Sequence, residues 1–197
     1  MRKIVVLEFM TLDGVIQAPG ASKEDTAEGF KYGGWMGPHF DKVGGQEMEK
    51  QMKKTSGLLL GRKTYNIFAG YWPQHIENGW PQINKVPKYV ASKTLKNPSW
   101  ENTEVIKDVE GLKKLKNSNG PDLQVYGSAN LVQTLMEHDL VDEFWLKIFP
   151  ITLGTGKRLF GEGTVPAAFK LFKSKITPSG IIFVYYMRAG DVKTSSV

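Results

Sequence analysis

Residues 123–160 read LQVYGSANLVQTLMEHDLVDEFWLKIFPITLGTGKRLF, and they decide the fold of this chain. The first four, 123–126, are rich in apolar side chains, which is typical of a short strand buried in a sheet. Gly127 then predicts a turn at which a ligand can approach the backbone closely. Ser128 is a favourable N-cap for an amphipathic helix. The stretch therefore predicts a strand, a tight glycine turn and a helix, and residues 142–151 predict a further long strand.

The first turn of the predicted helix contains no acidic side chain, only Ala129, Asn130 and Leu131. The positive end of the helix dipole is therefore not compensated by the chain itself, and it favours an anion such as a phosphate. An ordinary serine-capped helix is the alternative, because one glycine turn is a weak signal.

Three short segments of this stretch carry a resemblance to a known family. They are GSA at 127–129, LVDE at 140–143 and PITLGTGKRLF at 150–160. In order and spacing they resemble the C-terminal reductase domain of the bifunctional riboflavin-biosynthesis deaminase-reductase family. The resemblance implies a dihydrofolate reductase-like fold. The zinc signature of the deaminase half is missing, as a chain without cysteine requires.

Length and composition indicate an ordinary globular protein. The chain has 197 residues, 41% hydrophobic and 23% charged, which suits one domain at 1–188 followed by a polar tail at 189–197. The absence of cysteine excludes disulfides, thiolate metal sites and cysteine nucleophiles, and no metal site is predicted. The N-terminal apolar run is short and is interrupted by Glu8, so it predicts a strand. We expect a cytoplasmic protein that does not enter a membrane.

The chain is basic, with a formal net charge of +6 and a pI of about 9.3. Its lysines and arginines are spread along the sequence, and no aromatic-basic signature of RNA binding is present. We therefore expect a phosphorylated small molecule as the partner, and no nucleic acid. Nucleic-acid binding is the alternative that a basic composition leaves open.

The order of predicted elements defines the fold class. Eight strands and four helices, mostly alternating and closing with a hairpin, predict an α/β fold of three layers with a mixed, mainly parallel sheet. The predicted strands are 3–10, 56–60, 88–91, 104–107, 123–126, 142–151, 169–177 and 181–188. The predicted helices are 46–54, 61–69, 108–117 and the one that follows Ser128.

Three elements suited to phosphate follow successive strands. In the second of the predicted helices, two cations in the first turn oppose the helix dipole, a conflict that a bound phosphate resolves. Solvated surface cations are the alternative. This element resembles the G-R-x-T-[WY] segment of dihydrofolate reductases, whose Arg and Thr contact the phosphates of NADPH, and the resemblance implies NADPH as the cofactor. The predicted cofactor-binding residues are Gly61, Arg62, Lys63, Thr64, Ser92, Lys93, Gly127, Ser128, Ala129, Asn130 and Leu131.

The substrate side is expected near the first strand. By resemblance, the TLDG segment at 11–14 lies near the nicotinamide. The glycine- and aromatic-rich loop at 17–45 either lines a pocket or is an aromatic-anchored surface loop, and the role of a second long loop at 70–87 is open. The predicted substrate-pocket residues are Leu12, Asp13, Trp35 and Phe40.

The implied chemistry is hydride transfer from NADPH to a C=N or C=O group of a small heterocycle, of a pyrimidine or pteridine-like kind. Candidates for the proton donor are Asp13, Asp41 and Glu47, with Glu49 nearby, and none lies in a matching motif. A nucleotide-binding module that kept the fold without the chemistry is therefore the alternative.

A homodimer is expected through the late strands, because their aromatic content exceeds what one small sheet edge normally exposes. The aromatic residues are Phe144, Trp145, Phe172, Phe183, Tyr185 and Tyr186.

Overall fold

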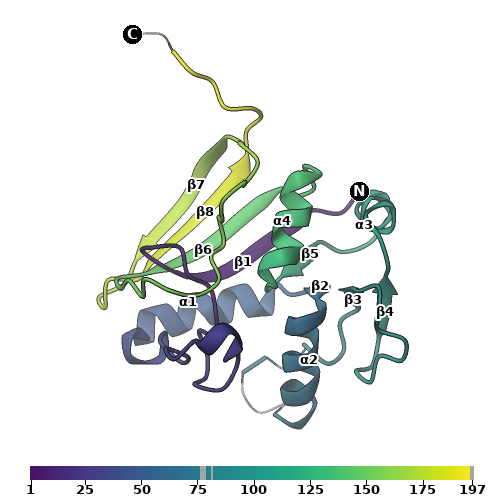
Figure 1. The fold of residues 1–197 in the computed structure, drawn as a ribbon, viewed down its shortest axis with the longest axis horizontal. Helices are drawn as coiled ribbons and strands as arrows, with labels where there is room; N and C mark the ends of the chain where they lie inside the picture. The colour runs from purple at the N-terminus through teal and green to yellow at the C-terminus, as the bar shows by residue number, and fades with distance from the viewer. Residues whose placement is uncertain (76–78, 81, 196–197) are drawn as a thin grey trace.

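The computed structural model describes residues 1–75, 79–80 and 82–195. Among these residues, eight strands form one sheet in the order β4-β3-β2-β5-β1-β6-β8-β7 (Figure 1). The strands are β1 (Ile4–Thr11), β2 (Leu58–Gly61), β3 (Lys88–Ala91), β4 (Thr103–Ile106), β5 (Leu123–Val125), β6 (Glu143–Phe149), β7 (Phe169–Ile176) and β8 (Ile182–Arg188).

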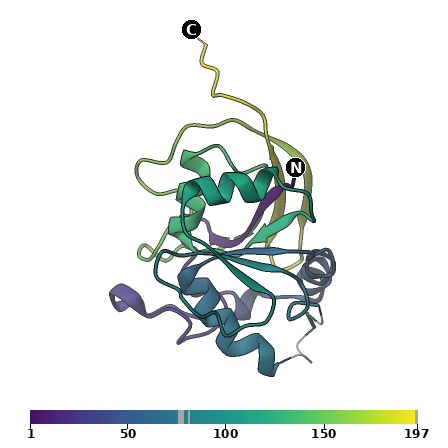
Figure 2. The ribbon, with the colours of Figure 1, turned by 90° about the vertical axis from the view of Figure 1, so that its right-hand side faces the viewer.

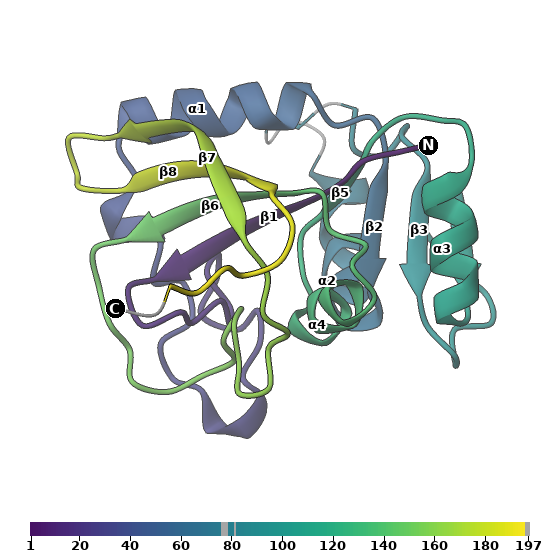
Figure 3. The same cartoon turned by 90° about the horizontal axis from the view of Figure 1, so that it is seen from above.

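The sheet is mixed, as predicted. β4, β3, β2, β5, β1 and β6 run parallel, whereas β8 is antiparallel to both β6 and β7. The central strands carry unbroken apolar runs because helices cover both of their faces. Figure 3 shows the β7–β8 hairpin toward one end of the sheet and β3 toward the other.

Four α-helices in the described part of the chain form the outer layers. They are α1 (Lys42–Lys53), α2 (Arg62–Tyr71), α3 (Val109–Asn117) and α4 (Ala129–Glu137). The apolar sides of α3 and α4 pack on one face of the sheet, and α1 and α2 cover the other (Figure 2). The α/β fold expected from the sequence, with three layers and an eight-stranded sheet, is confirmed.

Several predicted boundaries are wrong by a few residues. The first helix begins at Lys42 rather than at 46, because the Asp41 carboxylate accepts a hydrogen bond from Gly44 N at 2.7 Å and so caps it. The long strand predicted at 142–151 ends at Phe149. The loop predicted at 70–87 begins later, since α2 continues through Tyr71. Residues 76–78 and 81 of this loop lie outside the described part of the chain.

The argument for an exposed aromatic surface on the late strands is only partly right. Phe144, Phe183 and Tyr185 are at most 3% exposed, so they pack inside the protomer and offer no surface to a partner. Phe172 on β7 is 43% exposed. Side chains alternate between the two faces of a strand, and only one face of this hairpin region meets helix α1 and the core.

Beyond β8, the described residues of the tail form no helix or strand, and Figure 1 shows the chain running away from the sheet. Within the described residues, every helix is too short or too polar to span a bilayer.

Candidate dinucleotide site

Two glycine turns meet at the carboxyl ends of neighbouring strands. α2 begins directly after β2, α4 begins shortly after β5, and β2 pairs with β5. Gly61 N donates a hydrogen bond to Gly127 O at 3.3 Å. A Cβ atom added at Gly61 would lie 2.1 Å from the Ser128 Oγ, and one at Gly127 would lie 3.1 Å from the Thr64 Oγ1. The fold therefore brings four of the predicted cofactor residues together, and it requires glycine at both turns.

The two helix starts make this edge attractive to an anion. Neither α2 nor α4 has an acidic residue in its first turn, so both dipoles present uncompensated positive ends. Ser128 occupies the N-cap position of α4, as predicted, but its hydroxyl makes no capping hydrogen bond. Ala129 and Asn130 are accessible at the helix start, whereas the Leu131 side chain is buried in the core and leaves only its backbone to the edge.

The two cations at the start of α2 have different surroundings. Arg62 Nε donates to Asn66 Oδ1 at 3.0 Å, and within the described residues no carboxylate pairs with the Arg62 guanidinium. Lys63 Nζ lies 2.5 Å from Asp25, which also pairs with Lys157 at 2.9 Å. Burial alone would raise the pKa of Asp25, but hydrogen bonds from the two lysines outweigh it and lower the pKa to about 2. Lys63 therefore ties the loop at 17–45 to α2, and Arg62 is the cation left for a ligand.

The third predicted element lies beside the first. Because Gly61 is in register with Ala91, Ser92 and Lys93 follow β3 next to the start of α2. The Ser92 Oγ accepts hydrogen bonds from two backbone N–H groups that follow it, at 3.3 and 3.1 Å, so it stabilises its own turn. The Lys93 side chain is exposed.

Asp13, a candidate proton donor, is used to hold a loop. Its carboxylate accepts hydrogen bonds from Gly154 N at 2.7 Å and from the Thr11 hydroxyl at 2.5 Å, and Leu153 N lies at 3.2 Å. Partial desolvation would raise the pKa of Asp13, but these hydrogen bonds lower it overall. The carboxylate thus fixes the glycine loop after β6 against the turn after β1.

Asp41 and Glu49 are also placed for structural roles. Asp41 caps α1 and accepts a second hydrogen bond from Ser179 N at 2.8 Å. The Gly44 N–H is the main reason that the pKa of Asp41 falls to about 2. Glu49 forms a surface ion pair with Lys53 at 2.7 Å.

Glu47 is buried under the β7–β8 hairpin. Its carboxylate accepts a hydrogen bond from the Tyr185 hydroxyl at 2.6 Å and one from Lys173, and it lies 3.6 Å from Lys50 and 3.7 Å from Lys175. Burial would raise the pKa of Glu47, but the hydrogen bonds from Lys173 and Tyr185 outweigh it and bring it to about 2. Glu47 is therefore a permanent carboxylate at neutral pH.

The predicted substrate-pocket residues separate into two groups. Leu12 is 62% exposed at the turn after β1. Trp35 is buried edge-to-face against Phe149, with ring centroids 5.2 Å apart, and its indole N–H donates to Gln17 O at 2.8 Å. Phe40 stacks on Phe149 at 6.2 Å. The aromatic part of the loop at 17–45 is thus packed into a core cluster.

The sequence interpretation gave no functional role to two buried charged residues, Glu8 on β1 and Lys147 on β6. Glu8 Oε1 and Lys147 Nζ are buried and have no hydrogen-bond partner among the described residues. Burial raises the pKa of Glu8 to about 8 and lowers that of Lys147 to about 7. The signal was present, because each is flanked by apolar residues on both sides within its strand, IVVLEFMT and EFWLKIF.

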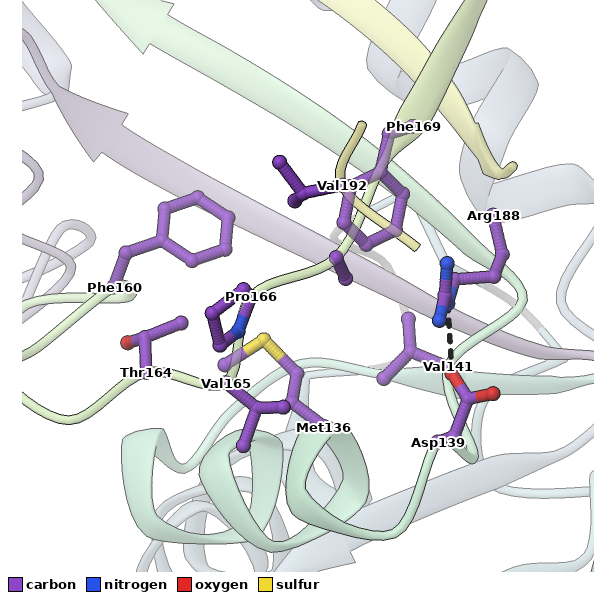
Figure 4. Close-up of a pocket in the computed structure, with 11 residues that line it drawn as sticks. Met136, Asp139, Val141, Phe160, Thr164, Val165, Pro166, Phe169, Arg188 and Val192 are labelled. Carbon is purple, nitrogen blue, oxygen red and sulfur yellow. Dashed lines mark hydrogen bonds and ion pairs between the residues drawn. The ribbon is translucent and has the colours of Figure 1, made fainter. Parts of the chain in front are cut away.

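A mostly apolar cavity lies elsewhere in the molecule. It has a volume of about 330 Å³ and lies between the end of α4, the segment before β7 and the end of β8 (Figure 4). Its lining is mostly apolar, and the charged side chains among its described lining residues, Asp139 and Arg188, pair with each other at 2.7 Å. This cavity is remote from the glycine turns, and it offers no free group for acid–base chemistry.

The fold and the paired glycine turns define a class of α/β protein with the dihydrofolate reductase-like arrangement expected from the sequence. The family model of the RibD C-terminal domain matches residues 2–183, and the chain belongs to this family.

Two proteins of Bacillus subtilis are similar to this chain in sequence. The uncharacterized Bacillus subtilis protein YyaP is 32% identical over 136 residues, 66% of this chain and 72% of that protein. The uncharacterized YwjB of the same organism is 27% identical over 95% of this chain and 99% of its own length.

Two solved structures show the shared fold. A putative riboflavin biosynthesis protein from a Shewanella species superposes with a TM-score of 0.71 at 23% identity, covering 95% of this chain and 99% of that one. The diaminohydroxyphosphoribosylaminopyrimidine deaminase/5-amino-6-(5-phosphoribosylamino)uracil reductase of Thermotoga maritima gives 0.63 at 14% identity, covering 95% of this chain and 57% of that one.

Proposed function

We propose that this protein is an NADPH-dependent reductase of a small pyrimidine or pteridine-like heterocycle. The observation that carries the proposal is the meeting of two uncompensated helix starts, through Gly61 and Gly127, at the carboxyl edge of neighbouring parallel strands. Open α/β sheets bind ligands at this edge. The names of the solved relatives, a riboflavin-biosynthesis protein and a uracil reductase, support the same substrate class.

The residues present fit a dinucleotide. The backbone N–H groups at the starts of α2 and α4, with the Thr64 and Ser128 hydroxyls, suit a pyrophosphate at this strand edge. Arg62, with Lys93 on the adjacent strand end, suits a 2′-phosphate. When bound, NADPH supplies the hydride. The protein positions the cofactor and the acceptor and excludes water from the crevice.

The test compares NADPH and NADH binding by fluorescence titration. Arg62→Ala should weaken NADPH binding about ten- to a hundredfold, since a charge-assisted hydrogen bond contributes roughly 1.5–3 kcal/mol, and it should weaken NADH binding much less. Lys63→Ala is the matched control, because Lys63 is already paired with Asp25. Gly127→Val should weaken both cofactors. An unchanged NADPH preference in Arg62→Ala would remove Arg62 from the 2′-phosphate site.

The runner-up function is a nucleotide-binding module without catalysis. It is favoured by one observation: Asp13, Asp41 and Glu47 are all held by structural hydrogen bonds or ion pairs. The two functions separate in one assay, in which NADPH absorbance is followed after adding 5-amino-6-(5-phosphoribosylamino)uracil and related pyrimidines and pteridines. Loss of absorbance that depends on the added heterocycle supports the reductase.

A further inference from the structure

The strand β5 ends where the proposed cofactor turn begins, while its neighbour β1 continues. β1 pairs with β5 only from Ile4↔Leu123 to Val6↔Val125, although β1 itself continues to Thr11 beside β6. α1 follows β1 on one face of the sheet, and α4 follows β5 on the other. A crevice between strands whose connections leave over opposite faces is the usual ligand position in open α/β sheets.

Glu8 lies on β1 just past the end of β5. It is two residues beyond the last β1–β5 pair, its exposed fraction is 6%, and its Oε1 has no hydrogen-bond partner among the described residues. That oxygen lies 3.5 Å from the position of a Cβ at Gly127. A buried carboxyl oxygen without a partner is rare, since it costs the desolvation of the group with no hydrogen bond in return. The unpartnered oxygen therefore borders the turn proposed to receive the pyrophosphate.

Three titratable groups face Glu8. Lys147 comes from β6, and its Nζ lies 4.9 Å from the centroid of the Phe9 ring and 5.9 Å from that of Tyr126, with no hydrogen-bond partner among the described residues. Tyr126 follows β5, and burial raises the pKa of its hydroxyl, so it stays protonated. Glu24, in the loop at 17–45, adds a more distant negative charge. From α2, the neighbour of the Gly127 turn is the uncharged Thr64.

We propose that Glu8 is a positioning residue that must be protonated for a dinucleotide to bind at the Gly127 turn. The inference rests on the proposed function, because it takes the pyrophosphate to lie at that turn. An ionised carboxylate there repels the pyrophosphate, whereas the neutral acid can donate a hydrogen bond to a phosphate oxygen. When Glu8 is ionised, its proton is held by Lys147 or by solvent. Dinucleotide binding thus takes up a proton at Glu8.

The direction of the pH effect follows from linkage. Burial raises the pKa of the Glu8 carboxyl to about 8, against the opposing influence of the Lys147 charge. A bound anion raises that pKa further, so affinity falls as pH rises between the free-state and bound-state values. The limiting slope for one proton is about tenfold per pH unit.

The experiment measures the dissociation constants of NADPH and NADH from pH 7.5 to 9.5 by fluorescence titration. NADH controls for the titration of the 2′-phosphate. In the unmodified protein, affinity for both cofactors should fall above about pH 8, by up to about tenfold per unit. In Glu8→Gln, which keeps the shape and cannot ionise, affinity should be independent of pH. Glu104→Gln, an exposed glutamate on β4, should behave as the unmodified protein.

A second variant shifts the effect rather than abolishing it. Lys147→Met removes the positive charge that favours ionised Glu8, so the fall in affinity should begin at a higher pH. A purely structural role for the pair would not move this midpoint. If Glu8→Gln loses affinity with pH as the unmodified protein does, the inference about Glu8 is overturned while cofactor binding stands. If neither cofactor binds at any pH, the proposed function is overturned as well.

Discussion

Two buried glutamates, Glu47 and Glu8, differ in what surrounds the carboxyl group. Glu47 lies between α1 and the β7–β8 hairpin, where Tyr185 and three lysines satisfy it and bring its pKa to about 2. Glu8 lies in the sheet beside the glycine turns with an unpartnered oxygen, and its pKa rises to about 8. Burial is common to both, so the partners decide the charge. A buried carboxylate with hydrogen-bond partners, such as Glu47, indicates a structural role. A buried carboxyl group without a partner, beside a strand edge that binds ligands, indicates a role in binding.

Substitution should separate the two glutamates most strongly. Glu47→Ala leaves a cluster of lysines and the Tyr185 hydroxyl without their acceptor, and we expect the free energy of unfolding to fall by about 3 kcal/mol. Glu8→Gln exchanges a neutral acid for an amide of the same shape, so we expect a change below about 1 kcal/mol. Urea denaturation at pH 5 measures both, because the stability that Glu8 loses on ionisation is lost mainly between pH 5 and 8. Glu49→Gln, on the exposed face of α1, is the control and should change stability by less than about 0.5 kcal/mol.

Acid should remove the contribution of Glu47. Its folded pKa of about 2 is below the ordinary value of 4.5, so the stabilisation is fully present above pH 4.5 and is lost as pH falls through about 2. The loss should be roughly 2 kcal/mol, because partly exposed lysines are screened by solvent. We expect the difference in unfolding free energy between the unmodified protein and Glu47→Gln to shrink over this range. A difference that stays constant down to pH 2 would contradict the pairing.

Glu8 should make the free energy of unfolding fall as pH rises, which is the opposite of the effect of Glu47. Its folded pKa of about 8 lies above 4.5, so its contribution is present below pH 4.5 and is lost as pH rises through about 8. The slope is at most about 1.4 kcal/mol per pH unit. The pKa of Lys147 is lowered to about 7, so its effect has the opposite sign. It makes the free energy of unfolding rise with pH between pH 7 and 10.5. In Glu8→Gln, the free energy of unfolding should fall less between pH 5 and 7 than it does in the unmodified protein. Urea denaturation at a series of fixed pH values measures this difference.

The sequence predicted the fold well because its signals are local. Apolar strands, the Gly127 turn and the capping of the third helix by Asp108 each depend on a few neighbouring residues, and the Asp108 carboxylate does accept from Gly111 N at 2.7 Å. The meeting of Gly61 with Ser128 depends on which strands lie next to each other, which the family resemblance supplied and the residue pattern alone did not.

The roles of the acidic residues were harder to predict, because the role of a carboxylate depends on which groups contact it in the folded chain. Asp13 is held by a loop 140 residues away, and Glu47 by the hairpin. Neither pairing leaves a local signal in the sequence. Glu8 and Lys147 did leave one, as charges flanked by apolar residues within a strand, and that pattern indicates a buried functional group.

The last prediction concerns β7, which supplies Lys173 and Lys175 to Glu47. This edge strand is largely exposed, with Leu171, Phe172 and Ile176 exposed by 46, 43 and 70%. Exposed apolar edge strands favour association. We predict a homodimer that covers this strand, joined through side chains, because the irregular register between Leu171 and Lys173 interrupts continued strand pairing.

Light scattering at about 10–50 micromolar, a concentration range suited to a stable interface, should give twice the chain mass of 22.1 kDa. Ile176→Glu should give the monomer mass, because it places a charge in the covered surface. Leu12→Glu is the matched control, since Leu12 is a similarly exposed apolar residue that follows β1, three strands away from β7 in the sheet. The monomer should also lose the Glu47 contribution at a pH a few tenths of a unit higher, since solvent screens Lys173 and Lys175 more fully without the partner. If the unmodified protein is monomeric at these concentrations, the acid stability of Glu47 is a property of the single chain alone.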